Sequence, residues 1–184
     1  QTAIYDILSA VTRLISPILV FTSEEIWQHM PASSAVNMDS VFYNDMPAES
    51  GIQVADPDHW EMLLKVRADV QKAMELKRAA KVFGKSLEAK VTLHCADDSL
   101  YSQLSAMADD LADLFIASQV AVVKGGEGEL QGDTEGLSVT AEKAEGGKCE
   151  RCWKVLPTVG SDGEYPTLCP RCAAAVKSLV DTTV

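Results

Sequence analysis

The chain has 184 residues, 47% of them hydrophobic, which is enough for one ordinary domain with a small satellite or for two small domains. No apolar run approaches the roughly 18 residues of a membrane span, so the composition favours a soluble, cytoplasmic chain without a membrane partner. The first residue is Gln1 rather than a methionine and already lies in a predicted helix, which suggests a fragment of a longer protein.

The formal net charge of −11 argues at first against a nucleic-acid partner, but the charges are unevenly distributed. Residues 1–60 carry 1 basic and 8 acidic side chains, whereas residues 61–90 carry 8 basic and 4 acidic ones. Residues 91–148 are acidic again, with 3 basic and 11 acidic side chains, and the remainder is balanced at 4 and 4. Such a basic run is usually a solvated helix face, and contact with a phosphate backbone is the alternative.

Two helices are predicted at the start of the chain. Residues 3–16 repeat apolar side chains at steps of three and four, which predicts a helix with one apolar face. This face comprises Ile4, Ile7, Leu8, Val11, Leu14 and Ile15. Thr22 and Glu25 fit a capping box, so a second helix is expected to begin there. Residues 32–55 lack a sustained period and predict a loop, with a short extended piece at 41–43.

A long helix is predicted next. Asp56 and Pro57 signal its start, as an N-cap followed by proline at the first helical position. The helix is expected to run to about Ala80, with Gly84 as its terminator. Its expected buried stripe contains or borders Trp60, Leu63, Leu64, Val66, Val70, Ala73, Met74 and Leu76.

The pattern then changes to a mixture of strands and helix. Alternation predicts a strand at 88–95, and further strands are expected at 116–123 and 137–141. A helix is predicted at 97–115, and Gly146-Gly147 is expected to hinge into the last segment. The predicted fold class is α+β, in three consecutive parts: a helical region at 1–83, a small α+β region at 84–145 and a four-cysteine zinc knuckle domain at 146–184.

Four cysteines near the C-terminus form two Cys-x-x-Cys knuckles separated by 16 residues, within the window of a four-thiolate zinc site. Two residues between cysteines let both sulfurs reach one ion at about 2.3 Å, and two knuckles complete a tetrahedron. Because four thiolates leave no open coordination position, the metal is expected to be structural. The predicted ligands are Cys149, Cys152, Cys169 and Cys172.

Other uses of the cysteines are less favoured. Rubredoxin-like iron would fit the same ligands, although the geometry rules favour zinc. Two disulfides or a redox motif are disfavoured because no signal peptide is recognised, Cys95 is left unpaired, and a redox pair needs only one motif.

Trp153 follows the first knuckle and is flanked by cations, with Arg151 before Cys152 and Lys154 after the indole. A rigidly held aromatic between cations suits stacking on an unpaired base. The alternative is that Trp153 covers the metal core.

The sequence shows no active site. His29, His59 and His94 are far apart and have no evident nucleophile, so surface or packed histidines are expected. Residues 84–86 resemble the tail of a phosphate-binding loop, but a Walker A motif needs a glycine where Ala79 stands. The chain is therefore expected to be non-catalytic.

Three segments resemble a known family. Residues 14–27 (LISPILVFTSEEIW) resemble the signature of the helical anticodon-binding domain of class I aminoacyl-tRNA synthetases for isoleucine, valine and leucine. Residues 81–93 (KVFGKSLEAKVTL) look like the bacterial isoleucyl enzymes in particular. Residues 148–153 (KCERCW) and 169–172 (CPRC) are similar to the C-terminal zinc-binding domain of those enzymes. In order and spacing, the chain resembles the C-terminal part of bacterial isoleucyl-tRNA synthetases.

The resemblance implies a full protein that uses ATP to join isoleucine to its tRNA, in catalytic and editing domains outside these residues. The chain itself would bind the anticodon stem-loop of isoleucine tRNA and one structural zinc ion, as a monomer without a DNA partner. The acidic segment 91–148 is expected to face away from the RNA. The candidate tRNA contacts, chosen on charge and on the knuckle aromatic, are Lys72, Lys77, Arg78, Lys81, Lys85, Arg151, Trp153 and Lys154.

Two other functions remain open. One is a free-standing zinc-ribbon adaptor that binds protein through its acidic surface, and the other is an iron electron carrier. Neither accounts for the helical signature at residues 14–27.

Overall fold

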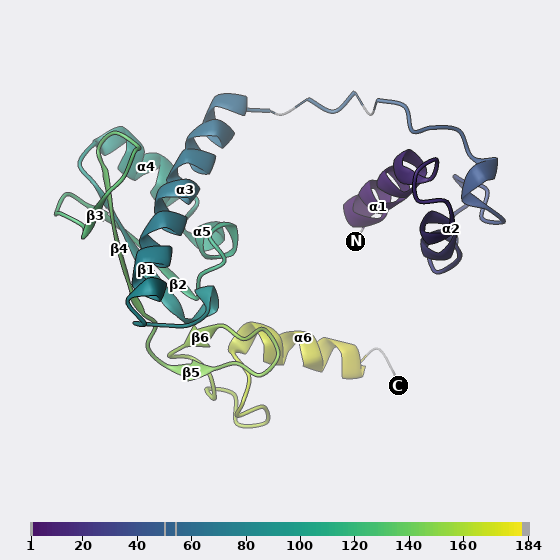
Figure 1. Cartoon of the computed structure of the whole chain (residues 1–184). Helices are drawn as coiled ribbons and strands as arrows, with labels where there is room; N and C mark the ends of the chain where they lie inside the picture. Colours follow the sequence, from purple (N-terminus) through teal and green to yellow (C-terminus); the bar gives the residue numbers. More distant parts are fainter. Residues whose placement is uncertain (1, 50, 54, 182–184) are drawn as a thin grey trace. The chain divides into compact units, whose positions relative to one another are not determined.

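The computed structural model describes residues 2–49, 51–53 and 55–181, with side chains described to residue 179. The chain forms two compact units, one from residues 1–55 and one from residues 56–184 (Figure 1). The helices of the first unit are α1 (Thr2–Ile15), α2 (Val20–Gln28) and the 3₁₀-helix η1 (Val41–Tyr43).

The first predicted helix is confirmed as α1, but its apolar face is exposed. Ile7 and Leu14 are 64% and 56% exposed, whereas Ser9 and Thr12 are buried. The Thr12 hydroxyl is satisfied because it donates to the Leu8 carbonyl at 2.7 Å. The apolar core of this unit lies elsewhere and consists of Trp27, Met30 and Val41, packed against Tyr5, Ile26, Val36 and Met38.

The capping box predicted at Thr22 is wrong. α2 begins at Val20, and the residue before it, Leu19, makes no side-chain cap hydrogen bond. The N–H groups of Ile18 and Leu19 both bond to the carbonyl of Ile15 at 2.9 Å. This turn after α1 leads directly into α2, so Thr22 lies inside the helix instead of capping it.

The extended piece predicted at 41–43 is also wrong, because these residues form η1. Ser40 caps it, with its hydroxyl oxygen accepting the N–H of Phe42 at 3.2 Å. The carboxylate of Glu24 on α2 accepts from the Ser40 hydroxyl at 2.9 Å and from the Val41 N–H at 3.1 Å. Glu24 therefore joins η1 to α2 and fixes the turn conformation.

The long predicted helix is confirmed as α3 (Pro57–Ala79), with Asp56 as its N-cap. The Asp56 carboxylate accepts the N–H of His59 at 3.1 Å, as an N-cap side chain should. The buried part of the predicted stripe is Leu63, Val66, Val70, Ala73 and Met74, whereas the exposed part is Trp60, Leu64 and Leu76.

The end of α3 differs from the prediction. Lys81 adopts a left-handed conformation with φ of 59°. Its N–H bonds to the Arg78 carbonyl at 2.9 Å, and the N–H of Val82 bonds to the Lys77 carbonyl at 3.0 Å. This is a Schellman cap with lysine in the position that glycine usually occupies. The helix therefore ends before the predicted terminator, Gly84.

The second unit contains a four-stranded sheet with the order β2-β1-β4-β3. β1 runs parallel to β2 and antiparallel to β4, with Val91 opposite both Val120 and Ala141. The strands are β1 (Ala89–Cys95), β2 (Gln119–Lys124), β3 (Leu130–Gln131) and β4 (Leu137–Lys143). The three predicted strands are confirmed, while the two-residue β3 was not predicted. The helix predicted at 97–115 is divided at Met107 into α4 (Asp98–Ala106) and α5 (Ala108–Leu114).

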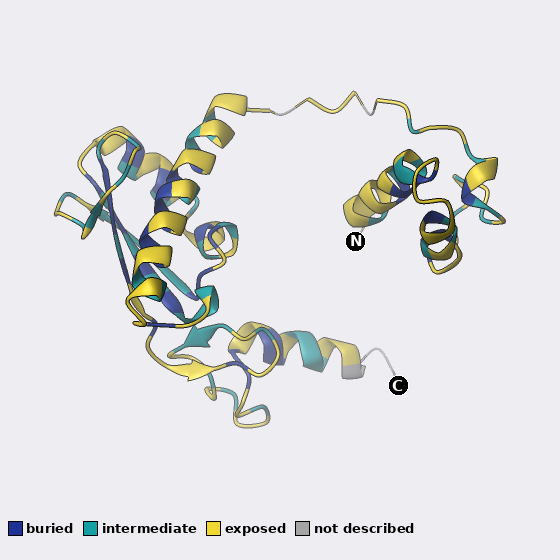
Figure 2. Ribbon diagram, in the orientation of Figure 1, coloured by how far each residue is buried: buried dark blue, intermediate teal, exposed yellow. Residues whose placement is uncertain are grey.

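α3 packs against the sheet, and its buried stripe forms one side of the main core (Figure 2). The largest fully buried side chains of this core include Leu63, Val66, Leu93, Leu104, Leu111 and Phe115. The sequence-based division at residue 83 groups α3 with the first two helices. In the structure α3 belongs to the compact unit of the sheet because its apolar stripe is covered by β4.

The C-terminal segment is a small module beside the sheet. Its elements are β5 (Gly147–Lys148), β6 (Val155–Leu156) and α6 (Pro170–Asp181). The Ser118 hydroxyl accepts the N–H of Val155 at 2.7 Å and so joins the module to the sheet. At the predicted hinge, Gly146 has φ of +114°, and a Cβ there would lie 2.3 Å from the carbonyl carbon of Leu156, so only glycine fits. The predicted α+β class is confirmed.

Candidate metal centre and nucleic-acid interface

The fold brings the four knuckle cysteines together. The sulfur atoms of Cys149, Cys152, Cys169 and Cys172 all lie within 4.8 Å of one another, and only Cys152 is partly exposed. The sulfurs of Cys152 and Cys169 are 3.8 Å apart. A tetrahedral ion with bonds of about 2.3 Å would separate its sulfur ligands by about 3.8 Å, so the cluster fits one four-coordinate metal ion.

The local backbone favours ionisation of the first thiol. Burial raises the pKa of Cys149, but hydrogen bonds from the N–H groups of Cys152, Cys169 and Arg151 outweigh burial and lower the pKa to about 6. The Cys169 N–H donates to the Cys149 sulfur at 3.3 Å. Burial and the neighbouring thiols raise the pKa of Cys152 to about 12. The Cys149 thiolate therefore forms readily, whereas Cys152 needs a cation beside it to ionise, which a metal ion supplies.

Trp153 does not cover the metal core. Its side chain is 60% exposed, and the buried cluster around the sulfurs is built from Leu168 and Ala173 with the cysteines. Trp153 has φ of 65°, a conformation that is strained for a bulky side chain. The Lys148 ammonium lies 5.8 Å from the centroid of the indole ring, within cation–π range. The knuckle thus presents an aromatic ring to solvent beside a cation.

Trp153 lines one of two surface hollows that share the residue Ser86. The first has a volume of about 120 Å³ and is lined by Trp153, Lys148, Lys85 and Ser86, among others. The second has a volume of about 360 Å³ and lies between α3 and the end of α5. Ser86, in the 3₁₀-helix η2 (Ser86–Glu88), borders both. The candidate tRNA contacts that line the two hollows are Lys72, Arg78, Lys85 and Trp153.

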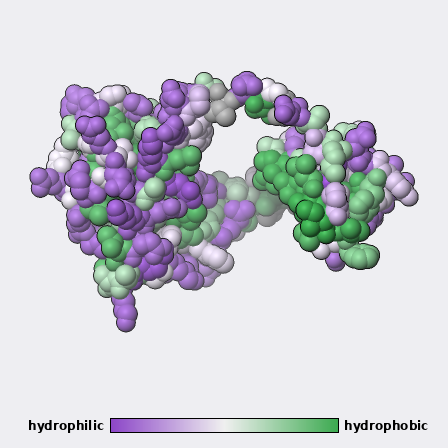
Figure 3. Space-filling model, turned by 45° about the horizontal axis from the view of Figure 1, so that its top comes forward, coloured by the Kyte–Doolittle hydropathy of each residue, from purple (hydrophilic) through white to green (hydrophobic). Residues whose placement is uncertain are grey.

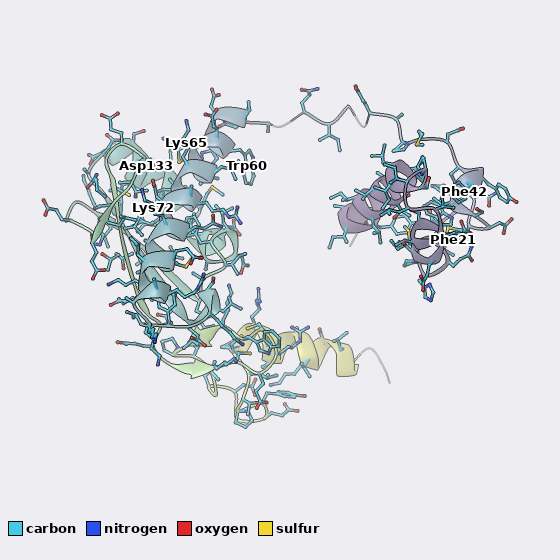
Figure 4. The ribbon with its side chains drawn as sticks, viewed as in Figure 1. Phe21, Phe42, Trp60, Lys65, Lys72 and Asp133 are labelled. Carbon is cyan, nitrogen blue, oxygen red and sulfur yellow. The ribbon has the colours of Figure 1, made fainter. Side chains whose placement is uncertain are left out.

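Part of the acidic segment 91–148 lies beside the basic helix α3 and pairs with its lysines, and the expectation that this segment faces away from the RNA stays a prediction. The ammonium of Lys72 lies 3.7 Å from the Asp133 carboxylate (Figure 4), and Lys77 forms an ion pair with Glu129. Both acidic residues come from the β3 region, which packs beside α3. The Lys72–Asp133 pair is exposed and therefore weak, so Lys72 can exchange the carboxylate for a phosphate, whereas Lys77 is half-buried.

The other candidate contacts are placed differently. Arg78 pairs with Glu75 and donates to the Ser86 hydroxyl at 2.9 Å, so it forms part of the wall between α3 and η2. Lys154 lies 2.5 Å from the Asp113 carboxylate, and only 16% of its side chain is exposed. Lys154 therefore holds the knuckle against α5, whereas Lys81 and Lys85 are exposed.

Arg151 lies beside the metal site. Its guanidinium donates to the Cys172 sulfur at 3.7 Å, which places a positive charge beside the thiolates. The residues of the hollows that were not predicted include Lys148, Ser86 and Ile116. Lys148 and Ser86 directly adjoin predicted residues in the sequence, which was a usable signal, but no local pattern marks Ile116.

The three histidines contact different groups, and Nδ1 of His29 lies 2.8 Å from the Glu25 carbonyl oxygen. His59 contacts the Met107 sulfur at 3.0 Å, and His94 shares a hydrogen bond of 3.1 Å with the Thr140 hydroxyl. Burial raises the pKa of the Cys95 thiol, as expected for an inert core cysteine. Within the described part of the chain, no helix combines the length and the apolar character that crossing a membrane requires.

Comparison with known proteins matches both ends of the chain to families. Residues 1–93 match the family described as the anticodon-binding domain of tRNA ligase, and residues 146–175 match the zinc finger found in FPG and IleRS. The chain is 42% identical over 183 residues to the isoleucine–tRNA ligase of Staphylococcus saprophyticus and 43% identical over 180 residues to that of Staphylococcus aureus strain JH9.

Each alignment covers 98% of this chain and 19% of the relative, so the chain spans about a fifth of the length of these relatives. The resemblance inferred from the three sequence segments is thus confirmed, and the part that matches is the C-terminal part of those ligases. With a match over 93 of its 184 residues, the chain belongs to the family of anticodon-binding domains of tRNA ligases.

Proposed function

We propose that this chain is the tRNA-binding C-terminal part of an isoleucine–tRNA ligase. The observation that carries the proposal is the presence of both family matches in one chain that is 42–43% identical to such ligases. The whole protein would join isoleucine to its tRNA with ATP, in catalytic and editing domains outside these residues. It would act as a monomer in the cytoplasm, and the residues of this chain would not take part in the chemistry.

One structural zinc ion is held by Cys149, Cys152, Cys169 and Cys172. The sulfur spacing and the match to a zinc-finger family support zinc. With four thiolates the ion has no open position, so its role is to fold the module and to hold Trp153 in place. The match beginning at residue 146 also supports the proposed domain of 146–184.

The RNA ligand is the anticodon stem-loop of isoleucine tRNA. Exposed cations on and after α3, with Arg151 at the knuckle, supply phosphate contacts, which fix position but not sequence, while Lys154 holds the knuckle against α5. Trp153 stacks on an unpaired loop base, because single-stranded RNA is recognised through splayed bases on aromatic rings. Its exposure and its strained backbone both support a functional role.

The test is the affinity of the 184-residue chain for isoleucine tRNA and for the same tRNA with a changed anticodon, at one moderate salt concentration. We expect tighter binding to the native anticodon. Trp153→Ala should weaken binding by about 5- to 150-fold, the usual range for loss of one stacked base. Trp60→Ala is the matched control, because Trp60 is also exposed but lies outside both hollows. Equal binding of both tRNAs would contradict anticodon reading by this chain.

A further inference from the structure

Ile116 has an unusual backbone conformation for its residue type. It lies directly after α5, and its φ is 58°. The Ile116 N–H bonds to the Asp113 carbonyl at 3.2 Å, and the N–H of Ala117 bonds to the Ala112 carbonyl at 2.9 Å. This is a Schellman cap, in which glycine is the usual residue at the left-handed position. A β-branched side chain is a clear outlier there and makes the cap less stable.

The Ile116 side chain does not offset this strain by burial. It is 52% exposed, whereas the neighbouring Phe115 and Ala117 are buried. The main core is therefore complete without it. An exposed, strained apolar side chain in a well-packed unit calls for a reason outside folding, because strain of this kind concentrates at functional sites.

The surroundings of Ile116 have the chemistry of a nucleotide site. Ile116 borders the hollow of about 360 Å³ between α3 and α5, opposite the cations Lys72 and Arg78. Gln71 on the same wall adds an amide that can both donate and accept hydrogen bonds. A nucleotide has an apolar ring face, polar base edges and an anionic phosphate. The aliphatic Ile116, the amide of Gln71 and the two cations complement these three features in turn.

The hollow shares one lining residue, Ser86, with the hollow that Trp153 lines. Ser86 borders both hollows, so a single strand that passes through them meets Ile116 in one and the indole ring in the other. Glu75 is the acidic group on this wall and is paired with Arg78, so its negative charge is balanced. Lys72 on the same wall pairs with the exposed Asp133, at 3.7 Å, a weak pair in which a phosphate can replace the carboxylate.

We propose that Ile116 is an RNA contact, whose side chain packs on the base or sugar of one unpaired nucleotide while the phosphate lies toward Lys72 and Arg78. This inference rests on the proposed function and adds a second nucleotide site beside that of Trp153. The strain at Ile116 is retained because glycine or asparagine, which suit the cap better, offer RNA no aliphatic surface.

The test combines stability with RNA affinity. Ile116→Asn and Ile116→Gly suit a left-handed cap, so the melting temperature should stay the same or rise. Affinity for an isoleucine tRNA transcript should nevertheless fall by about three- to tenfold, as expected for loss of a partly buried aliphatic contact. The slope of affinity against salt should not change, because no charge is removed. Leu64→Ala on α3, another exposed aliphatic residue that lies outside the hollow, is the control and should leave affinity unchanged.

Each outcome has a clear meaning. Weaker RNA binding by folded Ile116 variants with an unchanged salt slope supports the nucleotide site. Unchanged affinity, while the unaltered chain binds tRNA and Trp153→Ala weakens binding, overturns the role of Ile116 alone. If the unaltered chain binds no tRNA at all, the proposed function fails and this inference fails with it.

Discussion

The helices α1 and α3 have similar sequence patterns but opposite environments. The apolar stripe of α3 is covered by the sheet, with Leu63 and Val66 fully buried. The stripe of α1 is exposed, and the buried positions of that helix are Ser9 and Thr12. Figure 3 shows apolar side chains gathered over the surface of the first unit. Periodicity therefore predicts a helix and its apolar side, but it does not say what covers that side.

The two units also differ in what holds them together. The second unit combines a sheet, an apolar core and a sulfur cluster, whereas the core of the first unit is a few side chains around Trp27. Trp27 is completely buried, and its indole N–H donates to the Asn37 carbonyl at 3.0 Å. Apolar burial stabilises a fold roughly in proportion to area, so substitutions in the two units should have very different effects.

Metal removal should have the largest effect in the second unit. Chelation or Cys169→Ser should unfold residues from about 146 onward and leave α1 to α5 intact, because such modules gain on the order of 10 kcal/mol from zinc. Limited proteolysis with and without a chelator measures this. Cys95→Ala removes a cysteine outside the cluster and should leave the cleavage pattern of the module unchanged. A C-terminal segment that stays protease-resistant without metal would contradict the prediction.

The core of α3 should show the next largest effect. Leu63→Ala should lower the free energy of unfolding of the second unit by about 2–5 kcal/mol, because a fully buried leucine leaves a cavity. The neighbouring Leu64→Ala should change it by less than about 0.5 kcal/mol, because Leu64 is exposed. Urea titration followed by circular dichroism measures both. Equal costs would show that the two sides of α3 are not distinguished by the sheet.

A polar contact on α3 should have an intermediate effect. Asp69 is buried and accepts the N–H groups of Asp133 and Thr134 at 2.7 and 3.0 Å. Asp69→Asn places an amide against these donors and should cost about 1–3 kcal/mol. Asp133→Asn is the matched control, because its exposed pair with Lys72 contributes at most about 1 kcal/mol.

The effect of Asp69 should depend on pH. Burial favours the neutral acid, but hydrogen bonds from Thr134 and Asp133 outweigh burial and lower the pKa of Asp69 below 3.8. The stabilisation from ionised Asp69 is therefore fully present above pH 3.8, the ordinary pKa of the group. It is lost as the pH falls through the lower pKa of the folded state. The free energies of unfolding of the unaltered chain and of Asp69→Asn should therefore become equal in that acidic range. A difference that stays constant down to the lowest pH would contradict this assignment.

The two units also differ in charge, because the basic residues are concentrated on and after α3 in the second unit. Reversing charges on α3 tests whether this helix binds RNA. Lys77→Glu with Arg78→Glu should weaken tRNA binding and reduce the slope of affinity against salt by about one to two, since each lost phosphate contact removes about 0.9. Lys65→Glu is the control, because Lys65 is exposed on α3, pairs with Glu61 and is not among the candidate tRNA contacts. An unaltered slope in the double variant would place the phosphate contacts elsewhere.

The parts of the molecule that the sequence predicts are those with local causes. The cysteine spacing predicts the sulfur cluster because each knuckle is formed by neighbouring residues, and Asp56 with Pro57 predicts the start of α3. Helix ends were harder to predict. Lys81 and Ile116 adopt the left-handed cap conformation that glycine or asparagine usually occupies. Because Lys81 ends α3, the helix stops before the predicted terminator Gly84.

Other features depend on the whole fold. β3 has two residues, which is too short for an alternating pattern, and it forms by pairing with β4. The two hollows combine α3, η2, the end of α5 and the knuckle, which are far apart in the sequence. No local signal could therefore place Ile116 opposite Lys72 or predict that Lys77 would meet Glu129.

The smallest stability effect is expected on α1, where it tests the opening comparison directly. Ile7→Gln should change the free energy of unfolding by less than about 0.5 kcal/mol, because a side chain that is already in solvent loses little on replacement. It should also reduce self-association, since exposed apolar patches favour aggregation. Thr12→Val, by contrast, changes a buried position of α1, because it removes the hydroxyl that donates to the Leu8 carbonyl. A large loss of stability in Ile7→Gln, similar to that of Leu63→Ala, would show that the stripe of α1 is covered in solution and that the two helices are alike after all.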